Sequence, residues 1–197
     1  DVYKRQVGED FDRNWQPGAS SDQFYGGAAG SLYFLACLVS AADQGRIPAE
    51  TCDVTAVREL LERAVSSLGE QFGGTGGMPL VVPWEHTPSG WSSGTMGQLL
   101  ALAQCRASAT PPSDEAIPNL ISQAARDLRD NWAGLSEEEI AELTVSDLEV
   151  INGLAGNIRV LSCLAEVGGK EDYPNISSAI AAGTQVLDCL LYTSDAA

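Results

Sequence analysis

The chain has 197 residues, a formal net charge of −16 at pH 7 and 44% hydrophobic residues. This length suffices for one domain with a hydrophobic core, because domains of about 100–200 residues are common. The strongly acidic charge opposes binding to phosphate backbones and anionic lipid, so we expect no nucleic acid partner. No apolar run approaches the roughly 18 residues that a membrane span needs, so no membrane partner is expected either.

The two ends of the chain have the composition of sequencing adapters. Residues 1–6, Asp-Val-Tyr-Lys-Arg-Gln, are the translation of a transposon end, and residues 189–197 match the reverse complement of the same DNA in another frame. Segments of this kind are excluded from fold reasoning. We therefore expect one partial domain at residues 7–188, truncated at both ends and derived from a longer metagenomic reading frame.

The cysteines do not form a metal-binding pattern. His86 is the single histidine, and Cys189 belongs to the adapter segment. The other cysteines show no C-x-x-C spacing: Cys37, Cys52, Cys105 and Cys163. A free cysteine inside an apolar run behaves as a small hydrophobe, which favours a reducing, cytoplasmic setting.

A short glycine-led pattern recurs three times along the chain, in residues 27–36, 94–103 and 153–162. In each copy Gly-x-x-Gly is followed by an aliphatic residue two and five positions after the second glycine, and by a small residue six positions after it. These offsets lie on one face of a helix. The second glycines stand at positions 30, 97 and 156, so the repeats are separated by 67 and 59 residues.

An amphipathic helix is predicted after each glycine-led helix. Apolar residues spaced by threes and fours run from Val54 to Phe72, from Ile117 to Trp132 and from Ile176 to Leu187. Ser136 and Glu139 have the spacing of a capping box before a short helix that ends near residue 143. Because the glycine-led helices are apolar nearly all round, we expect them to form a buried inner layer that the amphipathic helices enclose. The pattern predicts an all-α fold, a partial α/α toroid of about three helical hairpins or a curved solenoid.

The most function-like cluster is a Pro- and Gly-rich loop that carries His86 beside Trp84, Glu85 and Trp91. Such a loop either contacts a substrate or packs on the surface, and the second interpretation is favoured. The Gly-x-x-Gly motifs match no phosphate-binding fingerprint. Two carboxylate pairs, Asp127/Asp130 and Asp147/Glu149, are expected on solvated faces or linkers.

Three segments resemble the lanthionine synthetase C-like cyclases, most closely the cyclase domain of class II lanthipeptide synthetases, in which a dehydratase and a cyclase are fused. Residues 147–161 resemble the D-V-I-x-G-x-A-G segment of that family, while residues 24–32 and 90–97 resemble its first and second inner-helix motifs. Gly26 departs from the acidic residue expected there, and Thr95-Met96 departs from the usual small and apolar pair.

The resemblance implies an α/α toroid in which two cysteines and a histidine of later repeats hold zinc. The zinc would activate a cysteine thiol of a precursor peptide for addition to a dehydrated serine or threonine, which closes a thioether ring. No W-C-x-G or C-H-G motif occurs in residues 7–188. We therefore expect a fragment that is inactive alone, and we assign no catalytic, cofactor-binding or metal-binding residue within it.

Two other classes stay open. An α/α-toroid glycosidase or lyase would use a carboxylate with aromatic sugar platforms, for which Trp84, Glu85 and Trp91 are the candidates. A non-enzymatic helical-repeat binding module would instead continue the repeat without a downstream Cys/Cys/His set.

Overall fold

The fold is all-α, as predicted. A computed structural model describes residues 24–25, 27–73, 90–92, 94–108, 116–168 and 173–194. Within these ranges every regular element is helical, namely a 3-10 turn, η1 (Ala49–Thr51), and the helices α1 (Ala28–Asp43), α2 (Val54–Gly73), α3 (Thr95–Ser108), α4 (Ala116–Ala133), α5 (Glu137–Ala141), α6 (Val145–Leu148), α7 (Leu154–Gly168) and α8 (Ile176–Ser194).

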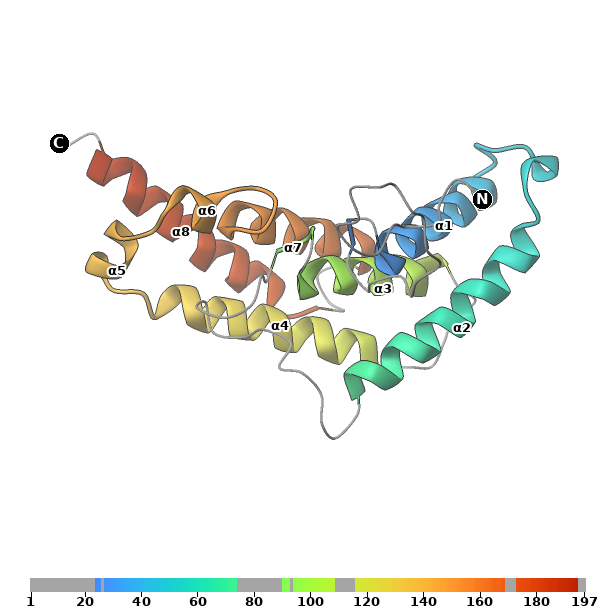
Figure 1. Ribbon diagram of the computed structural model, residues 1–197, viewed down its shortest axis with the longest axis horizontal. Helices are drawn as coiled ribbons and strands as arrows, with labels where there is room; N and C mark the ends of the chain where they lie inside the picture. Colours follow the sequence, from blue (N-terminus) through green and yellow to red (C-terminus); the bar gives the residue numbers. More distant parts are fainter. Residues whose placement is uncertain are drawn as a thin grey trace, which may run out of the picture.

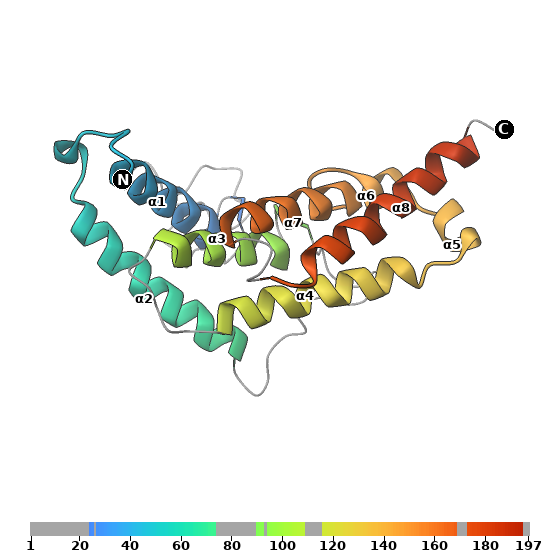
Figure 2. The same cartoon turned by 180° about the vertical axis from the view of Figure 1, so that it is seen from behind.

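The long helices form two layers. Helices α1, α3 and α7 pack in that order in one layer, and α2, α4 and α8 pack in the same order in the other. Each helix of the first layer also contacts the helix of the second layer that follows it, as Figures 1 and 2 show from opposite sides. The chain therefore consists of three stacked hairpins, which we call unit 1 (α1 and α2), unit 2 (α3 and α4) and unit 3 (α7 and α8).

Burial follows the position of each unit in the stack. Helix α3, which has a neighbour on both sides, buries nearly every residue between Met96 and Cys105. Helix α1 has one neighbour in its layer and buries a single stripe: Ala29, Leu32, Ala36 and Val39. The expectation that all three glycine-led helices are enclosed therefore holds for α3 alone, because α1 and α7 each leave one flank open.

The amphipathic stripe predicted for α4 is also confirmed. Leu120 is half-buried, and the other apolar residues of the stripe are buried in the core: Ile117, Ile121, Ala124, Ala125, Leu128 and Trp132. Ser136 and Glu139 form the predicted capping box at the start of α5. A second capping box, between Thr144 and Asp147, starts the short helix α6, which the sequence pattern did not indicate.

The second glycine of each motif lies against a backbone carbonyl. A Cβ added to Gly30 would lie 2.0 Å from the carbonyl oxygen of Phe24, and one added to Gly97 would lie 1.9 Å from that of Trp91. At Gly156 the same distance, to the carbonyl oxygen of Val150, would be 2.1 Å. In all three units the carbonyl belongs to the residue six positions earlier. The motif therefore exists because the loop before each first-layer helix folds back onto its first turn, where only glycine leaves room.

Polar contacts at the other end of the first layer hold unit 1 to unit 2. The hydroxyl of Ser108, a buried side chain, donates a hydrogen bond of 2.9 Å to the carbonyl of Ala36. The guanidinium of Arg58, on α2, donates to the carbonyl of Ser108 and to the carboxylate of Asp43 at the end of α1. Because one arginine binds the C-terminal ends of two helices, it also neutralises part of their negative dipole ends.

We predict that Gly97→Ala destabilises the chain by about 3 kcal/mol, because the added methyl group overlaps the carbonyl oxygen of Trp91 and must displace the loop that carries it. Urea denaturation followed by circular dichroism at 222 nm measures the loss. The control is Gly134→Ala, where the nearest atom would lie 3.1 Å from the new Cβ and the expected cost is below about 1 kcal/mol. Equal stabilities of the two variants would show that the loop does not need the glycine.

Candidate functional site

The loops that precede the three first-layer helices are joined by a backbone ladder. The N–H of Tyr25 donates a hydrogen bond of 2.8 Å to the carbonyl of Ser92, and the N–H of Ser92 donates one of 3.4 Å to the carbonyl of Ile151. All three residues stand five positions before the second glycine of their unit. The loops are therefore stacked in register, and every N–H of the ladder points toward the following unit.

Trp91 lies at the centre of this ladder. Its ring packs edge-on against Phe24 with 5.5 Å between ring centroids, and its indole N–H donates a hydrogen bond of 2.9 Å to the carbonyl of Val150. Phe24, Trp91 and Val150 each stand six positions before the second glycine, so the indole joins equivalent positions of units 2 and 3. The structure thus gives Trp91 a packing role, whereas its proposed neighbours in a substrate loop, Trp84, Glu85 and His86, lie outside the described residues.

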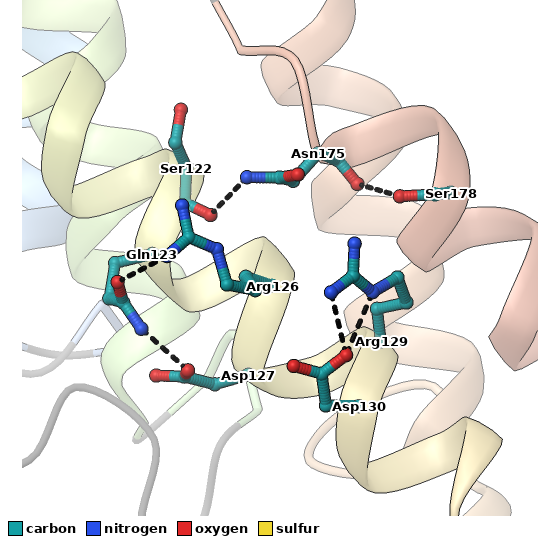
Figure 3. Close-up of polar contacts among 8 residues, drawn as sticks. All are labelled: Ser122, Gln123, Arg126, Asp127, Arg129, Asp130, Asn175 and Ser178. Atoms are coloured by element: carbon teal, nitrogen blue, oxygen red, sulfur yellow. Dashed lines mark hydrogen bonds and ion pairs between the residues drawn. The ribbon is translucent and has the colours of Figure 1, made fainter.

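The carboxylates chosen from the sequence do not form a catalytic pair. Asp127 accepts a hydrogen bond of 2.7 Å from the amide of Gln123, and the exposed Asp130 pairs with Arg129 at the same distance. Figure 3 shows both contacts on α4, beside Asn175, whose side-chain amide donates to a carbonyl of α4. Both aspartates are therefore engaged in contacts within α4.

The second carboxylate pair serves the turn before α7. The carboxylate of Asp147 accepts hydrogen bonds from the backbone and hydroxyl of Thr144. The backbone carbonyl of Glu149 accepts from the N–H groups of Gly153 and Gly156, which fixes the start of the helix. This arrangement matches the expectation of a linker position.

A group of thiols lies in the first layer around the phenol of Tyr33. Burial is the main cause that raises the pKa of Tyr33, and the nearby Cys37 and Cys163 raise it further. Burial also raises the pKa of Cys37, although a hydrogen bond with Tyr33 acts in the opposite direction. Cys105 is the most buried of the thiols, and desolvation, followed by the charge of Cys37, raises its pKa to about 12. The thiols of Cys37 and Cys105 are therefore protonated at neutral pH, which makes them poor nucleophiles.

Donor groups suited to a metal ion are not gathered within the described ranges. No cluster of three or more histidine, cysteine, aspartate or glutamate side chains occurs there. The zinc ligands that the family resemblance implies are expected in later repeats, and that expectation stays a prediction. Across the same ranges, none of the helices combines the length and the apolar character that crossing a membrane requires.

Sequence reasoning missed the ladder because a backbone contact places no common side chain at its positions. Tyr25, Ser92 and Ile151 share neither charge nor size. The signal that was available is the offset from the glycine motif, which aligns the three residues once the repeat is recognised.

In comparisons with protein-family models, curated proteins and solved structures, no match to this chain was found.

We predict that Cys105 resists alkylation in the folded chain. With a pKa of about 12 instead of the ordinary 9.0, its thiolate fraction at pH 8 is roughly a thousandfold lower, and the side chain is also buried. Iodoacetamide labelling followed by peptide mass spectrometry measures the rate, with the exposed Cys189 as the internal control and urea-unfolded protein as the reference. Equal labelling of both cysteines in the folded chain would contradict the prediction.

The same shift has a consequence for stability. Because the folded pKa of Cys105 is raised, this thiol favours the folded state below pH 9, and that contribution declines as the pH rises from about 9 toward 12.

Proposed function

We propose that this chain is a structural part of a lanthionine synthetase C-like cyclase domain, without its catalytic site. The domain it most resembles is the cyclase domain of a class II lanthipeptide synthetase. The observation that supports the proposal is the shared environment of Gly30, Gly97 and Gly156. The three segments that carry the family resemblance are the same three segments that fold back onto these glycines. Their likeness to the family motifs thus falls on positions that determine the architecture.

In this proposal the chain supplies architecture, and the chemistry belongs to other repeats of the parent protein. The full protein would bind a precursor peptide and add its cysteine thiols to dehydrated serine or threonine, with zinc from the downstream repeats acting on the thiol. The two layers of helical hairpins would form part of a closed α/α toroid. A cytoplasmic setting fits the free thiols of the described cysteines.

A non-enzymatic helical-repeat binding module is the second candidate, and one observation favours it. Trp91 and the four carboxylate-bearing residues singled out from the sequence all take part in packing, capping or local pairing. The same observation argues against the sugar-active alternative, because its aromatic platform at Trp91 is already committed to Phe24 and Val150.

The test begins with the DNA that flanks the coding region. We expect a W-C-x-G motif followed by C-H-G downstream and a dehydratase-like region upstream. A complete downstream toroid without the Cys/Cys/His set would overturn the cyclase proposal in favour of the binding module.

Metal analysis of purified proteins provides an independent check. We expect the protein encoded by the recovered gene to carry about one zinc ion per chain, and the present chain to carry none above background. Inductively coupled plasma mass spectrometry measures both contents. A zinc-free parent protein that fails to cyclise a dehydrated peptide would contradict the proposal.

A further inference from the structure

The turn before α7 contains Asn152-Gly153, the one place in the sequence where a glycine follows an asparagine. In such a pair the backbone nitrogen of the glycine, after losing its proton to hydroxide, can attack the side-chain carbonyl carbon of the asparagine, because no glycine side chain hinders the approach. The side-chain nitrogen leaves as ammonia, and a cyclic succinimide remains. Water then opens the succinimide at either carbonyl group, which gives aspartate or isoaspartate. Asn152 is therefore a candidate for deamidation with water as the co-reactant.

The fold holds both reacting groups in other contacts. The N–H of Gly153, which is buried, donates a hydrogen bond of 3.1 Å to the carbonyl of Glu149. Asn152 packs against Gly90 in the loop before α3, since a Cβ added to Gly90 would lie 2.1 Å from the Cα of Asn152 and 2.7 Å from its Oδ1. Attack requires the Gly153 nitrogen to give up its hydrogen-bonded proton and the Asn152 side chain to turn toward it. The reaction therefore requires the turn to open locally.

Isoaspartate does not fit the closed turn. Its main chain runs through the former side chain and so contains an additional methylene group. On one side of this insertion the carbonyl of Ile151 accepts the ladder hydrogen bond from Ser92. On the other side the N–H of Gly153 closes the turn onto Glu149. The lengthened main chain displaces one of these contacts when the other forms.

Aspartate keeps the length of the main chain but changes the charge of the turn. Its carboxylate takes the place of the half-buried Asn152 amide beside Gly90, which is buried. The segment just before it already carries the carboxylates of Asp147 and Glu149. Burial and like charges both disfavour an additional carboxylate there. Either product of the reaction therefore weakens the packing of the turn on the loop before α3.

We propose that Asn152 is a deamidation site whose reaction irreversibly detaches the loop before α7 from the loop before α3. Each opening of the turn exposes the pair to the reaction, and the product prevents the turn from closing again on Gly90. The helices of units 2 and 3 keep their own contacts, so the change is confined to the loops. The other units lack the site, because Gly26-Gly27 and Ser93-Gly94 stand at the positions equivalent to Asn152-Gly153.

The first measurement compares deamidation of the full chain in native buffer and in urea at the same mildly alkaline pH. Peptide mass spectrometry follows each asparagine, and electron-transfer fragmentation distinguishes isoaspartate from aspartate. We expect Asn152 to react at least about tenfold more slowly in the folded chain than in urea, because local opening limits the rate. In urea it should react faster than Asn119 and Asn131, which are followed by a bulky leucine and a bulky tryptophan.

Gly90→Ala tests whether the packing of the turn controls the reaction. The added methyl group overlaps the Cα of Asn152 and forces the turn away from the loop before α3. We expect the deamidation rate at Asn152 in native buffer to rise about tenfold. Gly134→Ala is the matched control, because the nearest atom would lie 3.1 Å from its new Cβ, and it should leave the rate unchanged. Circular dichroism shows whether both variants keep their helicity.

Hydrogen exchange on the unchanged chain tests the consequence of the reaction and needs no variant. Ion-exchange chromatography separates the deamidated fraction, because that fraction carries one more negative charge. We expect the amide of Ser92, which donates to Ile151, to exchange at least about tenfold faster in the deamidated fraction. The amide of Tyr25, which donates to Ser92 between units 1 and 2, should exchange as it does before the reaction.

Any one of three results would overturn the proposal. Asn152 could react equally fast in the folded chain and in urea, Gly90→Ala could react like Gly134→Ala while both variants keep their helicity, or Ser92 could exchange at an unchanged rate after deamidation. If Gly90→Ala does not fold, the first and third results decide.

Discussion

The close contact between a glycine and a carbonyl oxygen is the constraint on which the stacked hairpins depend. In each unit the loop before the first-layer helix returns to within about 2 Å of where a glycine Cβ would be. This contact fixes the position of the loop along the axis of its helix. Because the three loops occupy the same position on their helices, their backbones meet in register. The ladder from Tyr25 through Ser92 to Ile151 therefore forms without help from particular side chains.

The burial pattern of the helices follows from that registration. Helix α3 is held between two neighbours and excludes water from nearly its whole surface, whereas α1 and α7 each leave one flank open. Side-chain contacts also join the helices of the second layer. One example is Trp132, whose ring lies where a Cβ on Gly183 would approach within 2.8 Å.

Periodicity was sufficient to predict the all-α fold, the alternation of helix types and the apolar stripe of α4, because these depend on residues close together in the chain. The capping box at Ser136 was predictable for the same reason. Contacts between segments that are distant in the sequence could not be predicted in this way. The pairing of Trp91 with the carbonyl of Val150 and that of Gly183 with Trp132 join residues from different units, and no local pattern identifies such partners. The role of Trp91 was therefore uncertain from sequence, and His86 with its two neighbours lies outside the described residues.

The ladder also bears on how freely the units can diverge. Its hydrogen bonds use main-chain atoms, so the register between neighbours demands a glycine at one position and little else from the side chains of the loop. Tyr25, Ser92 and Ile151 illustrate the latitude, since a phenol, a hydroxyl and an aliphatic group occupy equivalent places. A stack with such an interface can accumulate substitutions in its loops while each hairpin keeps its position. The outer surface of the loops is thus available for new binding specificities at little cost to the fold.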